Sequence, residues 1–411
     1  MRNGSADVLI VGAGPAGSAT ALRLARRGHD VLIVERSDFP RDKPCGDTVN
    51  PGALFELRRL RIADRIERRL RPQRISGWRI EAPDGALLAA GYGSDGRGEA
   101  LVGWGVRRSD LDSALLDEAV GAGARVIFGF RVFDVLWESG RAVGVVGRQG
   151  TSRRALRSPV LIGADGLRSV VQRRLGLTRR RSRLCKIAVV AHLAAANGGG
   201  ATGELRVGGG RCCGYAPQRT GANITLVLPE AESASLGGAP LEFLISALRA
   251  FPDVLDRVRG CDLEPQSLVT GPFDRPVARL WSPGALLVGD AAGYYDPLTG
   301  QGIHQALLSA RLAASAVDGM RQGVASEAAA LRGYARALER RMRPKRWVQR
   351  IIEGVVTHPP LMSRFVRALA AEDAELGRRL LRVTGDIAHP ATLLSPAVWT
   401  RLIYRLTYGG E

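Results

Sequence analysis

The chain opens with a short apolar run that ends abruptly in a glycine-rich turn. Val8–Val11 has the β-branched character of a buried parallel strand. Glycine then occurs in G-x-G-x-x-G spacing, at Gly12, Gly14 and Gly17. A helical pattern follows, Gly28 ends it, and a second apolar run over 31–34 leads to Glu35. A strand, a glycine turn, a helix, a strand and an acid in this order predict a dinucleotide-binding unit.

Each residue type in this unit has a physical reason to be there. Gly12 permits the tight turn, Gly14 lets a pyrophosphate approach the backbone, and Gly17 lets the helix pack close to the strand. The helix N-terminus offers free N–H groups and a positive dipole end to the phosphates. Glu35 can accept hydrogen bonds from ribose hydroxyls. We assign two neighbouring residues to the same binding site, Ala16 and Arg36.

Two later apolar runs also end at glycine and aspartate. Residues 160–163 lead to Asp165 and Gly166, and residues 285–288 lead to Gly289 and Asp290. Parallel sheets bind their ligands beyond the carboxyl ends of their strands. We therefore expect the three turns to lie at one edge of one sheet.

The rest of the chain divides by pattern. Residues 75–90 read as a hairpin around Pro83-Asp84-Gly85, residues 184–270 are largely strand-like, and the tail from 336 is helical. The sequence predicts an α/β protein with a Rossmann-type cofactor-binding domain, an inserted β-sheet substrate domain and a helical C-terminal tail. We expect the first domain at 1–70, 101–182 and 276–335, the second at 71–100 and 183–275, and the tail at 336–411.

Composition narrows the classes of function. The 59 basic and 40 acidic residues give a net charge of +19, which would suit nucleic acid or an anionic surface. Few aromatic residues accompany the arginines and no nucleic-acid motif occurs, so we expect no nucleic-acid partner. The five cysteines show no metal spacing and no paired framework. We expect no metal, no signal peptide, no membrane span and a cytoplasmic location.

Three motifs in the right order resemble the FAD-binding flavoproteins that include aromatic hydroxylases, geranylgeranyl reductases and tryptophan-type halogenases. They are the opening G-A-G-P-A-G, the segment G-A-D-G-L-R-S around Asp165, and G-D-A-A-G around Asp290. The resemblance covers roughly residues 6–320. It implies FAD as the cofactor, with NAD(P)H as its reductant.

The resemblance also implies roles for individual residues. Asp290 would bind the ribityl chain, and the stretch after Arg107 matches a family arginine that contacts the cofactor. Arg108 is our choice for that arginine, with Arg107 left open. The turn 297–302 would present backbone N–H groups to the flavin ring. The residues so assigned to FAD are Asp165, Gly166, Gly289, Pro297, Gly300 and Gly302.

The loop Phe39–Asp47 looks most like the geranylgeranyl reductase branch, where a Pro-Cys-Gly loop lies beside the isoalloxazine. This resemblance places Cys45 and Gly46 at the flavin, makes Cys45 the candidate catalytic residue and makes Arg41 a phosphate-side arginine. Halogenases carry a lysine where this chain has Pro44, and their tryptophan-rich segment is missing. Halogenation is therefore disfavoured.

Two redox reactions remain open. The first is NAD(P)H- and O2-dependent monooxygenation of a polyketide, phenolic or isoprenoid type of molecule, through a flavin C4a-hydroperoxide. The alternative is reduction or dehydrogenation of a carbon–carbon double bond, as in geranylgeranyl reductases. Cys45 favours reduction, and Gln301, where reductases often carry an acid, leans towards oxygenation. A non-redox cyclase or binding protein is the alternative of another class.

The predicted substrate is a hydrophobic small molecule of natural-product size. Its pocket is expected between the flavin and the strands 187–193 and 223–228. His192 and His304 could act as acid–base groups, but a structural role is the simpler interpretation. In the tail, basic residues 340–346 precede an apolar stripe over 347–356. The stripe can pack on the body of the protein or make a weak peripheral membrane contact. The sequence implies no particular oligomeric state.

Overall fold

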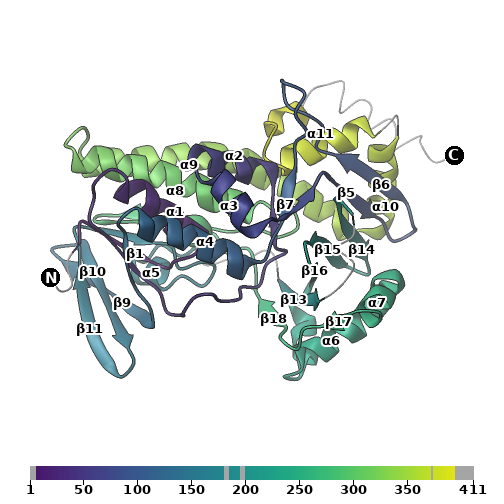
Figure 1. Ribbon diagram of the computed structural model, residues 1–411, viewed down its shortest axis with the longest axis horizontal. Helices are drawn as coiled ribbons and strands as arrows, with labels where there is room; N and C mark the ends of the chain where they lie inside the picture. The colour runs from purple at the N-terminus through teal and green to yellow at the C-terminus, as the bar shows by residue number, and fades with distance from the viewer. Residues whose placement is uncertain (1–5, 180–184, 195–199, 372–373, 394–411) are drawn as a thin grey trace.

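A computed structural model describes residues 6–179, 185–194, 200–371 and 374–393 (Figure 1). The expected domain border at 182–183 and the end of the expected tail region lie outside these residues. All bounds below are those of the described chain.

A six-stranded sheet forms the core of the cofactor-binding half. In spatial order its strands are β19 (Trp281–Ser282), β20 (Ala285–Leu287), β12 (Val160–Gly163), β1 (Val8–Val11), β2 (Val31–Val34) and β8 (Arg125–Ile127). All neighbours pair in parallel except β19 with β20. Every residue of β1, β2 and β12 is buried, as continuous apolar strands between covering layers require. The three expected glycine turns therefore leave adjacent strands at one edge.

Helices cover this sheet. Helix α1 packs against α4 and α8, and α8 also contacts α2 and α9. The helices of this half are α1 (Pro15–Ala25), α2 (Pro51–Arg59), α3 (Ala63–Leu70), α4 (Arg108–Gly121), α5 (Val170–Arg174) and α8 (Gly302–Arg321). A separate three-stranded sheet lies at the left of Figure 1. It comprises β9 (Phe130–Glu138), β10 (Arg141–Gln149) and β11 (Ser152–Arg157).

A second large sheet occupies the other half of the molecule. Its order is β17 (Asp262–Leu263), β13 (Lys186–Ala194), β16 (Gly221–Pro229), β15 (Arg211–Gln218), β14 (Thr202–Gly208), β5 (Gly77–Glu81) and β6 (Leu87–Gly91), with β18 (Leu268–Thr270) also paired to β13. The expected hairpin is β5–β6, and β5 pairs in parallel with the much later β14. Both stretches expected in the substrate domain thus contribute strands to one sheet.

Shorter elements connect and cover these sheets. A three-stranded sheet joins β3 (Thr48–Val49), β7 (Gly103–Gly105) and β4 (Gln73–Ile75). Beside the large sheet lie η1 (Glu230–Leu236), α6 (Pro240–Ala247), η2 (Leu248–Ala250) and α7 (Pro252–Arg259). The turn after β20 is η3 (Gly289–Ala292), and η4 (Pro390–Leu393) ends the described chain.

The tail is helical, as expected, in α9 (Glu327–Val356), α10 (Pro359–Ala370) and α11 (Glu375–Thr384). Helix α9 packs along α8, whereas α10 and α11 contact β6. Most of the apolar stripe of α9 faces inward, with Val348, Val355 and Val356 buried and Trp347 exposed. Among the described residues, no helix is both long enough and apolar enough to cross a membrane.

Candidate functional site

The glycines of the β1–α1 turn are required by contacts and by backbone conformation. Gly12 has φ +103°, and a Cβ on it would lie 2.5 Å from the carbonyl oxygen of Ala164. A Cβ on Gly17 would lie 1.9 Å from the carbonyl oxygen of Gly12, but one on Gly14 would meet only Arg41, at 3.6 Å. No side chain caps the first turn of α1. Gly14 therefore leaves a cradle open above free helix N–H groups, which fits the pyrophosphate of FAD.

Glu35 lies at the end of β2 and points back to this turn. Its Oε2 accepts a hydrogen bond from the Ala13 N–H at 2.8 Å, and its Oε1 accepts one from the Ser37 N–H at 3.1 Å. The side chain is buried. Each carboxylate oxygen has a second lone pair, so Glu35 can hold the turn and accept a ribose hydroxyl together. The neighbouring Arg36 is exposed.

Charged side chains gather beyond the turn. Buried Arg108 makes a bidentate pair with Asp112, both bonds 2.8 Å, and Arg41 approaches the same carboxylate at 3.4 Å. Lys43 faces Asp290: loss of hydration lowers the pKa of Lys43 and raises that of Asp290, while their mutual attraction opposes both shifts. Lys43 is a site residue that motif reasoning missed. Its position two residues before Cys45 in a Pro/Gly-broken loop was the available signal.

The structure separates the two adjacent arginines. Arg107 forms an ion pair with Glu264, whereas Arg108 is buried beside Cys45. Helix α4 starts at Arg108, and Asp112 is occupied by that arginine.

Both carboxylate oxygens of Asp165 accept hydrogen bonds from groups of the turn that follows it. Oδ1 accepts from the Ser169 hydroxyl at 2.5 Å, and Oδ2 accepts from the N–H groups of Val170 and Val171 at 2.6 and 3.2 Å. It therefore organises the start of α5. Gly166, with φ +76°, lies near Lys43. Contact of this turn with FAD stays a prediction. Because the Asp165 carboxylate already has partners, the backbone of Gly166 is better placed than that carboxylate to make the contact.

The third turn brings together residues from distant parts of the chain. Gly289 has φ +59°, and a Cβ there would lie 2.8 Å from the Cβ of Ala16 in α1. Further on, the N–H of Gly300 bonds to the Pro297 carbonyl at 3.0 Å, and Gly302 begins α8. Gly300 has φ +64°. Residues 289–302 thus place a tight backbone turn beside the first glycine turn.

Asp296, just before this turn, is buried, and only one of its two carboxylate oxygens accepts a hydrogen bond. Its Oδ1 accepts from the Leu298 N–H at 2.7 Å, while Oδ2 is buried without a hydrogen-bond partner. Burial raises the pKa of Asp296 to about 6, against the opposing bond from Leu298 and with help from the nearby Glu353 carboxylate. Lys186 pairs with Glu353 at 2.6 Å.

The Cys45 loop is fastened to the substrate sheet by residues that the motifs did not identify. Asn223 Nδ2 donates to the Cys45 carbonyl at 2.9 Å. Asp47, almost fully buried with φ +52°, pairs with His192 at 2.6 Å and accepts from Gln218 at 2.9 Å. His192 therefore serves a buried carboxylate, as its structural interpretation held. Burial raises the pKa of the Cys45 thiol, against the opposing effect of Arg108, so the thiol is protonated at neutral pH.

An apolar pocket of about 1500 Å³, part of it open to solvent, begins at these turns. Gly46, Thr225 and residues 297–300 line one part, while β5, β6 and α9–α11 line the rest with side chains such as Leu88 and Phe365. The expected wall 223–228 is confirmed. The expected wall 187–193 is wrong: no residue of β13 is among the described lining residues, because its apolar side chains pack on α6 and α7. Sequence analysis did not anticipate that the C-terminal helices line this pocket.

Comparisons with known proteins agree with this arrangement. The family described as "FAD binding domain" matches residues 5–350. The chain is 34% identical over 329 residues to menaquinone reductase of Mycolicibacterium smegmatis, covering 76% of each protein. It is 30% identical over 326 residues to digeranylgeranylglycerophospholipid reductase 1 of Methanopyrus kandleri, covering 75% of this chain and 79% of that one. The crystal structure of a flavoprotein/dehydrogenase from Cytophaga hutchinsonii superposes with a TM-score of 0.84 at 19% identity, covering 99% of this chain and all of the other.

Proposed function

The chain belongs to the FAD-binding-domain family of FAD-dependent oxidoreductases, and we propose that it reduces a carbon–carbon double bond in a hydrophobic molecule of isoprenoid type. One observation carries this proposal: a continuous apolar pocket starts at the two turns assigned to the flavin, Cys45–Gly46 and 297–302, and extends under α9–α11. Such a pocket suits a long apolar chain. Menaquinone and digeranylgeranylglycerophospholipid, named for two relatives, both carry isoprenoid chains.

The residues at the cofactor edge have distinct proposed tasks. The α1 N-terminus and Arg41 would bind the pyrophosphate, Glu35 the adenosine ribose, and Asp290 the ribityl chain. Lys43 would balance the charge of Asp290 where both are removed from water. Bound FAD, once reduced by NAD(P)H, would supply a hydride to one carbon of the double bond.

The second carbon needs a proton, and Cys45 Sγ is the proposed donor. Its thiol lies in the loop beside the pocket and is kept protonated by burial. Buried Arg108 is positioned to stabilise the thiolate left after transfer, until solvent returns the proton. The apolar pocket walls exclude water from the reacting carbons.

An anaerobic assay distinguishes reduction from the monooxygenation that the sequence left open. The purified enzyme is incubated with FAD, NADPH and menaquinone, and products are analysed by mass spectrometry. We expect a product formed without oxygen whose two added hydrogen atoms persist after any quinol has been reoxidised in air and map by fragmentation to the isoprenoid chain. A gain that air reverses would indicate reduction of the quinone ring instead. A product that forms only in air and carries one atom from 18O2 would establish monooxygenation instead.

A weak contact with an anionic bilayer is a further part of the proposal. Arg340, Arg341 and Arg343 are exposed on α9 ahead of Trp347, whose side chain is also exposed. Basic and aromatic side chains on one helix suit the surface of an anionic membrane. A substrate of isoprenoid type dissolves in such a membrane, so the contact would bring enzyme and substrate together.

A further inference from the structure

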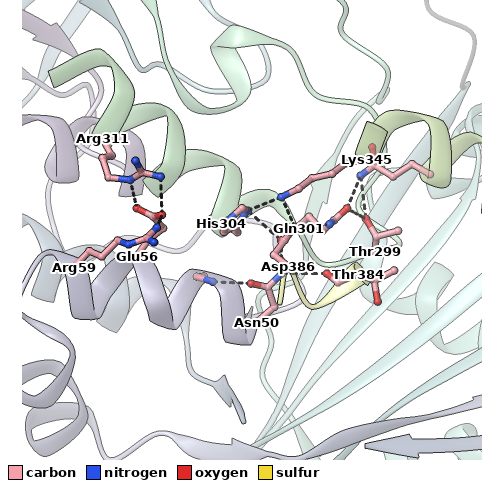
Figure 2. Close-up of polar contacts among 12 residues, drawn as sticks. Asn50, Glu56, Arg59, Thr299, Gln301, His304, Arg311, Lys345, Thr384 and Asp386 are labelled. Carbon is pink, nitrogen blue, oxygen red and sulfur yellow. Dashed lines mark hydrogen bonds and ion pairs between the residues drawn. The ribbon is translucent and has the colours of Figure 1, made fainter. Parts of the chain in front are cut away.

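Asp386 is a fully buried carboxylate that four side chains contact (Figure 2). It follows α11 with φ +59°, and its side chain has no exposed surface. Oδ1 accepts from Gln301 Nε2 at 2.8 Å and pairs with Lys345. Oδ2 accepts from Asn50 Nδ2 at 2.8 Å and lies 3.1 Å from His304 Nδ1.

These partners come from the two turns assigned to the flavin and from the long helices behind them. Asn50 caps α2 by accepting from the Ala53 N–H at 2.9 Å, directly after the Cys45 loop and β3. Gln301 precedes α8 and completes the 297–302 turn, where its Oε1 accepts from Thr299 at 3.0 Å. One carboxylate thus connects the 297–302 turn to Asn50, in the segment that follows the Cys45 loop.

The fit around Asp386 is tight as well as polar. The N–H of Gly52 bonds to the Gly385 carbonyl at 2.8 Å, and a Cβ on Gly52 would lie 2.3 Å from the Cβ of Asp386. Burial alone would raise the pKa of Asp386, but the charges of Lys345 and His304 hold it well below its usual range. The Asp386 carboxylate is therefore ionised at neutral pH and well into the acidic range.

The same segment forms part of the substrate pocket. Leu381 and Thr384, in the last turn of α11, line it, and the Thr384 carbonyl oxygen accepts a hydrogen bond from Asn50 Nδ2 at 3.3 Å. Asp386 therefore joins a pocket wall to the 297–302 turn and to the start of α2, which follows the Cys45 loop.

We propose that Asp386 is a positioning residue that fixes the 297–302 turn and the Cys45–Asn50 segment relative to each other and to the pocket wall. The inference rests on the proposed placement of FAD. Hydride transfer requires reacting atoms about 3–3.5 Å apart, and a displacement of about 1 Å can cost roughly a hundredfold in rate. Loss of the connection should consequently slow the chemistry in enzyme that still holds its flavin.

Glu56 supplies a matched control in the same view (Figure 2). This buried carboxylate also joins α2 to α8, through Arg311 at 2.8 and 3.0 Å, and bonds to Arg59 at 2.7 Å. It contacts neither flavin turn. Asp386→Asn and Glu56→Gln each remove one buried charge between the same helices. Because Asp386→Asn leaves Lys345 unpaired, the double variant Asp386→Asn/Lys345→Met is made alongside it.

Each variant is loaded with FAD, and three quantities are compared with wild type: melting temperature, midpoint potential of the bound flavin, and the single-turnover rate with menaquinone. We expect both Asp386 variants to shift the potential and lower the rate ten- to a hundredfold, with Glu56→Gln lowering only the melting temperature. Wild-type potential and rate in flavin-loaded Asp386 variants would overturn the proposal.

Two further outcomes are decisive. If the Asp386 variants do not fold, Gln301→Leu tests the same connection by removing only its flavin-turn partner, and the same shift in potential is expected. A Gln301→Leu enzyme with unchanged potential and rate would overturn the inference. If wild-type enzyme binds FAD but does not reduce menaquinone, the proposed function fails, while the potential of the bound flavin still decides the role of Asp386.

Discussion

Glu35 illustrates how one side chain can serve both the fold and the ligand. It bonds to the N–H groups of Ala13 and Ser37, so its removal loosens the glycine turn as well as the ribose site. Glu35→Ala should weaken FAD affinity by about ten- to a hundredfold, equivalent to about 1–3 kcal/mol. Titration of apoprotein with FAD measures this. Asp30→Ala, at the opposite end of β2 and paired with Arg125, is the control, and equal affinities in the two variants would contradict the assignment.

Asp296 should make stability depend on pH. Its pKa rises from 3.8 when unfolded to about 6 when folded, so the fold favours the protonated acid. The resulting stability is fully present below about pH 3.8 and is lost as pH rises through about 6. The loss in free energy of unfolding amounts to about 3 kcal/mol. Asp296→Asn keeps the neutral form at every pH.

The difference in melting temperature between Asp296→Asn and wild type should therefore move in favour of the variant from pH 5 to pH 8. Asp117→Asn removes an exposed carboxylate from a surface ion pair with Arg69 and should show no such trend. A constant difference for Asp296→Asn would mean that the folded protein ionises this acid as readily as the unfolded chain does.

Cys45 should matter to the reaction more than to the fold. A half-buried thiol contributes little packing, and the loop is held through the Cys45 backbone by Asn223. Cys45→Ala should keep the melting temperature within a few degrees and lower turnover about a hundredfold or more, within the range for general acid catalysis. Turnover by Cys45→Ala equal to that of Cys212→Ala, a buried cysteine of the pocket wall, would remove Cys45 from the chemistry.

At the scale of elements, the β1–α1 unit was predictable because its signals are local. An apolar run, three spaced glycines and a terminal acid lie within 30 residues, and each is required by contacts inside the unit. Lys43, His192 and Asp386 gave no such signal. Asp386 meets Asn50 across 336 positions of sequence, and only the contact of residues 385–386 with the start of α2 brings them together. The pocket wall was misplaced for the same reason, because α6 and α7 already cover β13.

Substituting alanine for two glycines of the β1–α1 turn, Gly17 and Gly14, should have different effects. Gly17→Ala would place a Cβ 1.9 Å from a backbone oxygen, so we expect a large loss of stability with or without FAD. Gly14→Ala meets only a side chain at 3.6 Å and should leave the apoprotein folded. It should nevertheless lower FAD affinity at least tenfold, since the methyl group fills the pyrophosphate cradle. Melting curves with and without FAD measure both effects, and full FAD affinity in Gly14→Ala would contradict this placement.

At the scale of the molecule, the basic surface of α9 sets the expected membrane behaviour. Lys345 is engaged with Asp386, and Arg346 with Glu339, which leaves the exposed arginines of 340–343. Each basic residue near an anionic bilayer contributes about 1 kcal/mol. We expect weak sedimentation with anionic vesicles that disappears at high salt and in Arg340→Glu/Arg343→Glu. Arg148→Glu, an exposed arginine of β10, is the control, and equal loss in both variants would indicate non-specific attraction.

The strand order of the cofactor sheet also has a consequence for biosynthesis. Strand β1 precedes the other strands of this sheet in the sequence, its neighbours are β2 and β12, and β20 is the last strand to join, at residue 287. The first glycine turn packs on Ala164, and the third reaches Ala16 from Gly289. Nascent chains that end before β20 therefore carry apolar strands without their partners, and such exposed edges invite aggregation. The turns assigned to FAD come together only after β20 has been made, so we expect cofactor capture to follow the synthesis of this strand.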